Sequence, residues 1–72
     1  MKLYLKIYFS SEGKSIMDVI KMAEKVGFSP YVGDFDFVLD YETLEEFEEI
    51  TDKLHKTLKG TKTMYKVSTR NE

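Results

Sequence analysis

The spacing of apolar residues in this chain switches repeatedly between a period of two and a period of about 3.6, which are the periods of strands and helices. Apolar side chains alternate with polar or tyrosine side chains over residues 2–9, 35–40 and 61–69. A fourth apolar piece, residues 28–32, surrounds the only proline, Pro30, and predicts a short edge strand. Gly33-Asp34 follows it, which predicts a tight hairpin to the next strand.

Two segments carry apolar residues at helical spacing. The first, residues 16–26, follows Ser15 as an N-cap with Asp18 three residues on, and Gly27 is suited to the C-cap. The second begins with the capping box Thr43 and Glu46 and ends at Gly60. Its glutamates lie early and its lysines late, as the helix dipole favours. The predicted order is therefore strand, helix, strand, strand, helix, strand.

This order predicts a ferredoxin-like α+β fold, in which two helices cover one face of a four-stranded antiparallel sheet. The opposite face stays open. If the strand phases hold, that face carries an amphipathic and apolar set of side chains, namely Tyr4, Tyr8, Val38 and Met64. Pairing with a second copy would bury them, so we expect a homodimer or a higher ring. The alternative is a monomer with scattered surface aromatics.

Composition narrows the class of protein. With 72 residues, 42% hydrophobic, the chain predicts one globular domain, residues 1–72. It has no cysteine and one histidine, His55, so neither disulfides nor a metal site nor another cofactor is expected. A net charge of -2 disfavours a general polyanion binder. The apolar start is too short for a signal peptide or a membrane span, and we expect a cytoplasmic protein, with the Lys and Glu content typical of thermophiles.

The segment from Gly33 to Leu39, the helix start from Thr43 to Phe47 and the later Leu58-Lys59-Gly60-Thr61-Lys62-Thr63 together carry a resemblance. The chain resembles the effector-binding RAM domain of the Lrp/AsnC transcription regulators. The resemblance implies dimerisation through the sheets as in dimeric α/β barrels, assembly into rings, and amino-acid binding between dimers near the hairpin. The family's helix-turn-helix is missing ahead of the first strand, so we expect no direct DNA binding but co-assembly with full-length regulators.

The resemblance implies a ligand site formed by Gly33, Asp34, Phe35 and Asp36, with Thr61 and Thr63 approaching the same cleft. The carboxylates of Asp34 and Asp36 would bind an ammonium group, and the turn N–H groups a carboxylate. The competing interpretation gives Gly33 and Asp34 only a turn conformation, Asp36 a local hydrogen bond, and the threonines an ordinary place in a strand.

No catalytic residues are evident, and the leading hypothesis is a non-enzymatic module for sensing and self-assembly. A dimeric α/β barrel enzyme is one alternative, with His55 as the only histidine available, although its lysine neighbours indicate a solvated helix face. The other is a domain that binds single-stranded RNA by stacking bases on Tyr4, Tyr8 and Tyr65. Tyr65 is out of phase with the open face.

Overall fold

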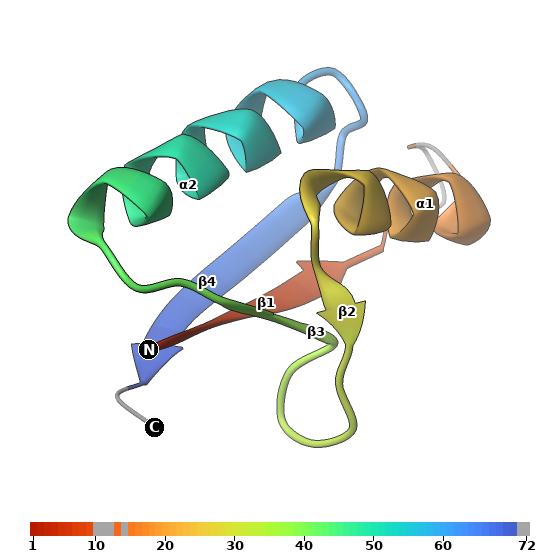
Figure 1. Cartoon of the computed structure of the whole chain (residues 1–72). Helices are drawn as coiled ribbons and strands as arrows, with labels where there is room; N and C mark the ends of the chain where they lie inside the picture. Colours follow the sequence, from red (N-terminus) through yellow and green to blue (C-terminus); the bar gives the residue numbers. More distant parts are fainter. Residues whose placement is uncertain (10–12, 14, 71–72) are drawn as a thin grey trace.

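The computed structural model describes residues 1–9, 13 and 15–70, and these form one four-stranded sheet and two helices (Figure 1). In chain order the elements are β1 (Lys2–Tyr8), α1 (Ile16–Val26), β2 (Ser29–Pro30), β3 (Phe37–Asp40), α2 (Leu44–Leu58) and β4 (Met64–Arg70). The strand order is β2-β3-β1-β4, and every neighbouring pair is antiparallel. Both helices lie on one face of the sheet, so the predicted ferredoxin-like arrangement is confirmed.

The helices begin where their caps predict. The Ser15 hydroxyl accepts a hydrogen bond from the N–H of Asp18 at 3.3 Å, and the Thr43 hydroxyl accepts one from Glu46 at 3.1 Å. The Glu46 carboxylate reaches back to the N–H of Glu42 at 3.0 Å, one residue before the usual capping-box partner. The two hydroxyl caps satisfy N–H groups that a helix start leaves without partners.

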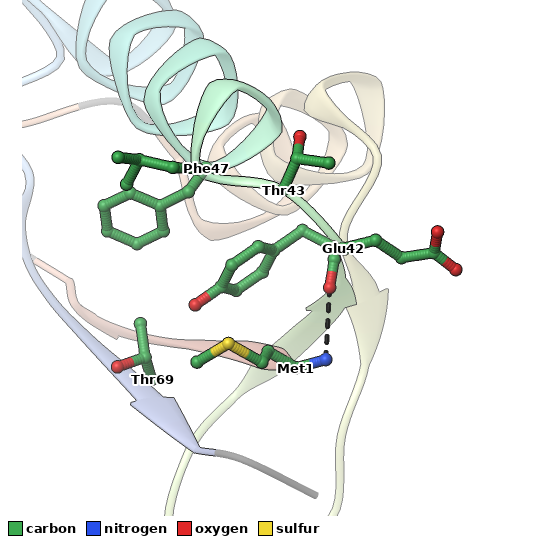
Figure 2. Close-up of a pocket in the computed structure, with 7 residues that line it drawn as sticks. Met1, Glu42, Thr43, Phe47 and Thr69 are labelled. Carbon is green, nitrogen blue, oxygen red and sulfur yellow. Dashed lines mark hydrogen bonds between the residues drawn. The ribbon is translucent and has the colours of Figure 1, made fainter.

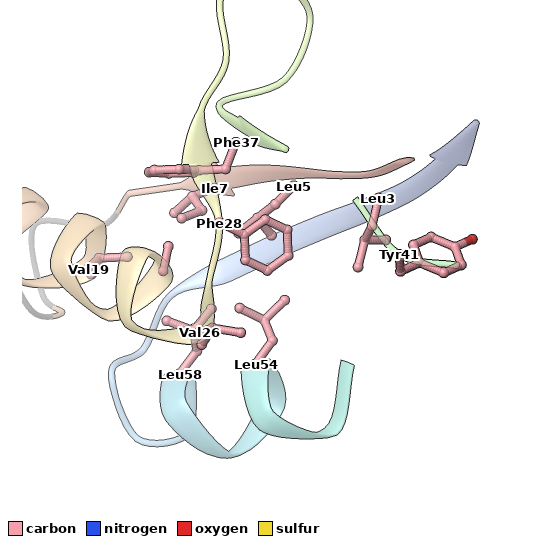
Figure 3. Packing of buried hydrophobic residues seen from close by; sticks show 11 residues of the cluster. Leu3, Leu5, Ile7, Val19, Val26, Phe28, Phe37, Tyr41, Leu54 and Leu58 are labelled. Atoms are coloured by element: carbon pink, nitrogen blue, oxygen red, sulfur yellow. The ribbon is translucent and has the colours of Figure 1, made fainter. Parts of the chain in front are cut away.

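The hydrophobic core lies between the helix layer and the sheet (Figure 3). Alternate residues of β1 point into it, and both helices contribute one apolar side to it. Its largest fully buried aliphatic side chains are Leu3, Leu5, Val19 and Leu54. The alternation of β1 therefore places one set of side chains in the core and the other on the open face.

The prediction of a tight hairpin between β2 and β3 is wrong, because the connection between these strands is longer. β2 contains only Ser29 and Pro30, and residues 31–36 form a loop before β3 begins at Phe37. The reason lies in Asp36, whose carboxylate accepts the backbone N–H of Ile7 at 2.9 Å. A side chain thus binds β1 where a longer β3 would have paired with it.

Two predicted apolar positions also differ. Ile16 and Leu44, each the first residue of its helix, are 54% and 70% exposed. Both precede the helix turns that pack on the core, so their helical phase does not bury them.

Neither helix in the described part of the chain is long and apolar enough to cross a membrane.

Candidate functional site

The open face of the sheet, opposite the helices, is the candidate site. The strand registers align the outward side chains across β3, β1 and β4: Tyr4 lies between Val38 and Ser68, and Lys6 lies beside Lys66. By this alternation the open face comprises Lys2, Tyr4, Lys6, Tyr8, Val38, Asp40, Met64, Lys66, Ser68 and Arg70. The phase predicted for Tyr4, Tyr8, Val38 and Met64 is confirmed.

Positive charge gathers on this face although the chain as a whole is negative. Lys2, Lys6, Lys66 and Arg70 all belong to it, while its one strand carboxylate, Asp40, lies 3.8 Å from Lys2. The glutamates among the described residues lie outside the strands, most of them on α2 or in the turn before it. The sheet face is therefore basic and the helix layer acidic, a separation of charge that the net value of -2 conceals.

Tyr4 is not open to solvent, contrary to the expectation of an uncovered face. It is 1% exposed, because the 31–36 loop folds over it on the side away from the helices (Figure 1). The Tyr31 ring meets the Tyr4 ring edge-on at 5.0 Å, and the Phe35 ring lies tilted at 5.5 Å. The Arg70 guanidinium lies 4.9 Å from the Tyr4 ring centre. One chain thus covers the centre of its own open face.

The residues of the predicted ligand group Gly33, Asp34, Phe35 and Asp36 mostly hold this loop in place. A Cβ at Gly33 would lie 2.7 Å from the Tyr31 ring, so only glycine leaves room for that ring. Phe35 packs on Tyr4. Asp36 donates its N–H to Leu5 and accepts the N–H of Tyr31, both at 2.9 Å. Asp34 is exposed, whereas Asp36 is half-buried.

Thr61 and Thr63 do not join the 31–36 loop within one chain. They precede β4, at the edge of the sheet opposite to β2, whereas the loop connects β2 and β3. The Thr61 hydroxyl is buried and donates to the Leu58 carbonyl at 2.7 Å. The Thr63 hydroxyl donates to the Thr61 carbonyl at 3.4 Å, in a turn that delays β4 until Met64. A cleft shared by both groups would need a second chain.

The other residues of the predicted dimer interface are more accessible than Tyr4. Tyr8 and Met64 are cross-strand neighbours, 48% and 75% exposed, and Val38 is half-buried beside Tyr4. The Lys6 ammonium lies 5.8 Å from the Tyr8 ring centre. This end of the open face combines an exposed aromatic ring, an apolar side chain and cations.

Sequence reasoning missed the hollows that flank α2. One of about 300 Å³ lies at the start of the helix, where Tyr41 and Phe47 pack at 5.4 Å and the amino group of Met1 donates to the Tyr41 carbonyl at 3.1 Å (Figure 2). Leu44 and Thr69 complete it. Leu44 is exposed in this hollow and, with Met1, Tyr41 and Phe47, gives it a largely apolar lining.

A second hollow, of about 230 Å³, lies at the end of α2 between His55, Lys59, Lys62 and Tyr65. His55 is exposed, and its Nδ1 lies 3.5 Å from the Tyr65 hydroxyl. Tyr65 therefore faces the helices, as predicted, and does not belong to the open face. Within the described residues no three His, Cys, Asp or Glu side chains come together as metal ligands would.

A third hollow, of about 280 Å³, is lined by Phe9, Ile20, Pro30, Asp36 and Phe37.

Comparisons with known proteins leave the site's function open, because no protein-family model, no curated protein and no solved structure matches this chain.

Proposed function

We propose that this chain is a non-enzymatic module for sensing and self-assembly, whose open face binds a small molecule with a carboxylate, such as an amino acid. The observation that carries the proposal is the gathering of Lys2, Lys6, Lys66 and Arg70 on the face that no helix covers. These cations surround aromatic rings, a combination suited to an anionic ligand with an organic body.

Arg70 is the best candidate to hold the carboxylate. Its guanidinium lies 4.9 Å from the Tyr4 ring centre and 5.7 Å from that of Phe35, and contact with two rings restricts its rotation. A guanidinium positioned in this way can donate two parallel hydrogen bonds to a carboxylate. Asp34 is exposed on the same loop as Phe35 and is free to bind an ammonium group. An amino acid carries both groups.

Ligand binding and assembly are coupled in this proposal. Two copies that pair through their open faces would bring the cations of one face close to those of the other, which is unfavourable. An anionic ligand between the faces would offset this repulsion while Tyr8 and Met64 became buried. The same coupling would operate in mixed assemblies with full-length Lrp/AsnC-type regulators, the partners that the resemblance implies.

The test is a thermal-unfolding screen against the standard amino acids, combined with mass measurement in solution. A ligand at about 100 times its Kd should stabilise the fold by about 2.7 kcal/mol, a rise in Tm of roughly 10–20 °C for a domain of this size. Arg70→Gln should abolish the rise, and Lys53→Gln, an equal loss of charge on α2, should keep it. A flat screen with an unchanged mass would remove the sensing proposal.

Binding of single-stranded RNA is a second candidate, favoured by the Lys6 ammonium 5.8 Å from the exposed Tyr8 ring and by Lys66 on the neighbouring strand. Stacking on one ring with nearby cations is how such strands are bound without sequence preference. Fluorescence anisotropy would measure the affinity for a labelled oligouridylate. This affinity should fall with added salt and with Tyr8→Ala, but not with Tyr65→Phe. No binding at low salt would exclude it.

A further inference from the structure

The outer edge of β4 is a second candidate interaction surface, separate from the open face. All seven residues of β4 pair with β1 on one side, and in the described chain no strand pairs with the other side. Its helix-facing residues are incompletely covered: Tyr65 and Val67 are half-buried, and Thr69 is exposed. An unpaired strand edge with partly exposed apolar side chains favours addition of another strand.

We propose that a second copy of this chain pairs with this edge, β4 antiparallel to β4, around a two-fold axis at Val67. In that register Tyr65 lies opposite Thr69 of the second copy, and Lys66 lies opposite Ser68 of the second copy. Aromatic and β-branched residues are favourable cross-strand neighbours. The two sheets would become one continuous sheet, with all four helices on the same side.

Charge selects this register among its neighbours. A shift of the axis to Lys66 places Lys66 of one copy opposite Lys66 of the other. A shift to Ser68 places Lys66 of one copy opposite Arg70 of the other. Like charges directly opposite each other destabilise a strand pair. The axis at Val67 avoids both contacts and keeps helix-facing residues together, since residues of one face must meet residues of the same face.

The helix above the edge supplies charge complementarity. α2 lies on the β4 side of the sheet and runs antiparallel to β4 (Figure 1). Its first turn shares a hollow with Thr69, and its last turns share one with Tyr65. The middle of α2, at Thr51, therefore lies level with Val67. A two-fold axis there places the acidic first half of one α2 beside the basic second half of the other.

The side chains on the outer side of α2 make this specific. Leu44 and His55 lie toward β4, since one shares the hollow with Thr69 and the other contacts Tyr65. Glu48 and Thr51 lie between them at helical spacing, on the same side. Around an axis at Thr51, Glu48 of one copy meets His55 of the other, and the contact occurs twice. The short side chain of Thr51 lets the helices approach.

Sedimentation of the chain alone, without any added ligand, tests the pairing. We expect a dimer, and we expect Glu48→Lys to raise its dissociation constant by about tenfold, because the change places a cation beside the lysine-bearing second half of the other copy's α2 at two symmetric positions. Glu49→Lys makes the same change of charge one residue on, away from the edge, and should leave the dissociation constant unchanged. His55→Glu should weaken the dimer as Glu48→Lys does, and the double variant should recover most of the affinity.

A register-specific measurement distinguishes this dimer from one formed by the open faces. Because the chain contains no cysteine, a nitroxide can be attached at Thr69→Cys alone, an exposed β4 position on the helix side of the sheet that pairing of the open faces would not bring together. Strands about 4.8 Å apart with a rise of about 3.4 Å per residue place two such labels within roughly 15 Å, so their spectra should broaden. A label at Val32→Cys, in the loop beside the opposite edge, should not broaden.

A monomer at high concentration would overturn the inference. So would a dimer that is indifferent to Glu48→Lys and shows no broadening at position 69. The latter result would leave the proposed function intact, since pairing of open faces does not use α2. Conversely, an edge dimer that ignores amino acids would support the inference and count against the sensing proposal.

Discussion

The Asp36 carboxylate accepts a hydrogen bond from the backbone N–H of Ile7 at 2.9 Å, across 29 positions of sequence. The backbone N–H of Asp36 also donates to the Leu5 carbonyl at 2.9 Å. Asp36 thereby attaches the 31–36 loop to β1, and β3 begins only at the next residue, Phe37. The residue on which the family resemblance partly rests thus has a structural role in this chain.

Asp36→Ala is therefore expected to destabilise the fold by about 2 kcal/mol, because it leaves the partly buried Ile7 N–H without its charged partner. The free energy of unfolding in urea measures the loss. Asp34→Ala, in the same loop but exposed, should change it by less than about 0.5 kcal/mol. Equal losses at both positions would contradict the role given to Asp36.

Gly33→Ala should cost about 1–3 kcal/mol, because the new Cβ would lie 2.7 Å from the Tyr31 ring. The loss is expected to arise from the clash with the ring. In a chain that also carries Tyr31→Ala, Gly33→Ala should therefore cost much less. Urea unfolding of both single variants and the double variant gives the coupling energy. Additive losses would show that Tyr31 does not occupy this space.

Tyr4→Ala and Tyr8→Ala form a matched pair on the open face. Tyr4 is 1% exposed, so Tyr4→Ala should lower the free energy of unfolding by at least about 3 kcal/mol. Tyr8 is 48% exposed, so Tyr8→Ala should lower it by less than about 1 kcal/mol. Phe35→Ala, which removes part of the cover over Tyr4, should lie between them. Chemical denaturation at low protein concentration keeps association out of the measurement. Similar losses for both tyrosines would mean that the loop does not cover Tyr4.

Thr43→Ala should cost about 1 kcal/mol, since the Thr43 hydroxyl caps the N–H of Glu46 at 3.1 Å. Thr51→Ala is the control within the same helix. The Thr51 hydroxyl bonds only to carbonyls of its own helix, and alanine has the higher helix propensity, so this change should be neutral or stabilising. Circular dichroism during thermal unfolding compares the two, and Thr43→Ser should retain the cap.

The elements and their faces could be predicted because their causes are local. Ser15 and Thr43 cap the helices that they were predicted to cap, and the alternation of β1 separates Leu3 and Leu5 from Tyr4. The 31–36 loop could not be predicted in this way. Phe35, Phe37 and Leu39 alternate as a strand would, and only the contact of Asp36 with Ile7 decides that Phe35 lies in a loop.

For the candidate site too, some features could be predicted from local sequence and others depend on contacts between distant segments. Lys2, Lys6, Lys66 and Arg70 each have an open-face phase that sequence alternation indicates, so the signal for a basic face was present in each strand. Their union into one basic surface depends on β1 and β4 being neighbours. The predicted ligand group was assigned by resemblance, and its members meet β1 and Tyr4 through contacts distant in sequence.

The sequence alone therefore determined the order of strands and helices, their caps and the side chains that each face presents, because periodicity and capping act over a few residues. Only the tertiary structure decided that a loop buries Tyr4, that positive charge collects opposite an acidic helix layer, and that α2 lies along the free edge of β4. Those features arise when segments distant in the chain pack together, and no local pattern encodes which segments meet.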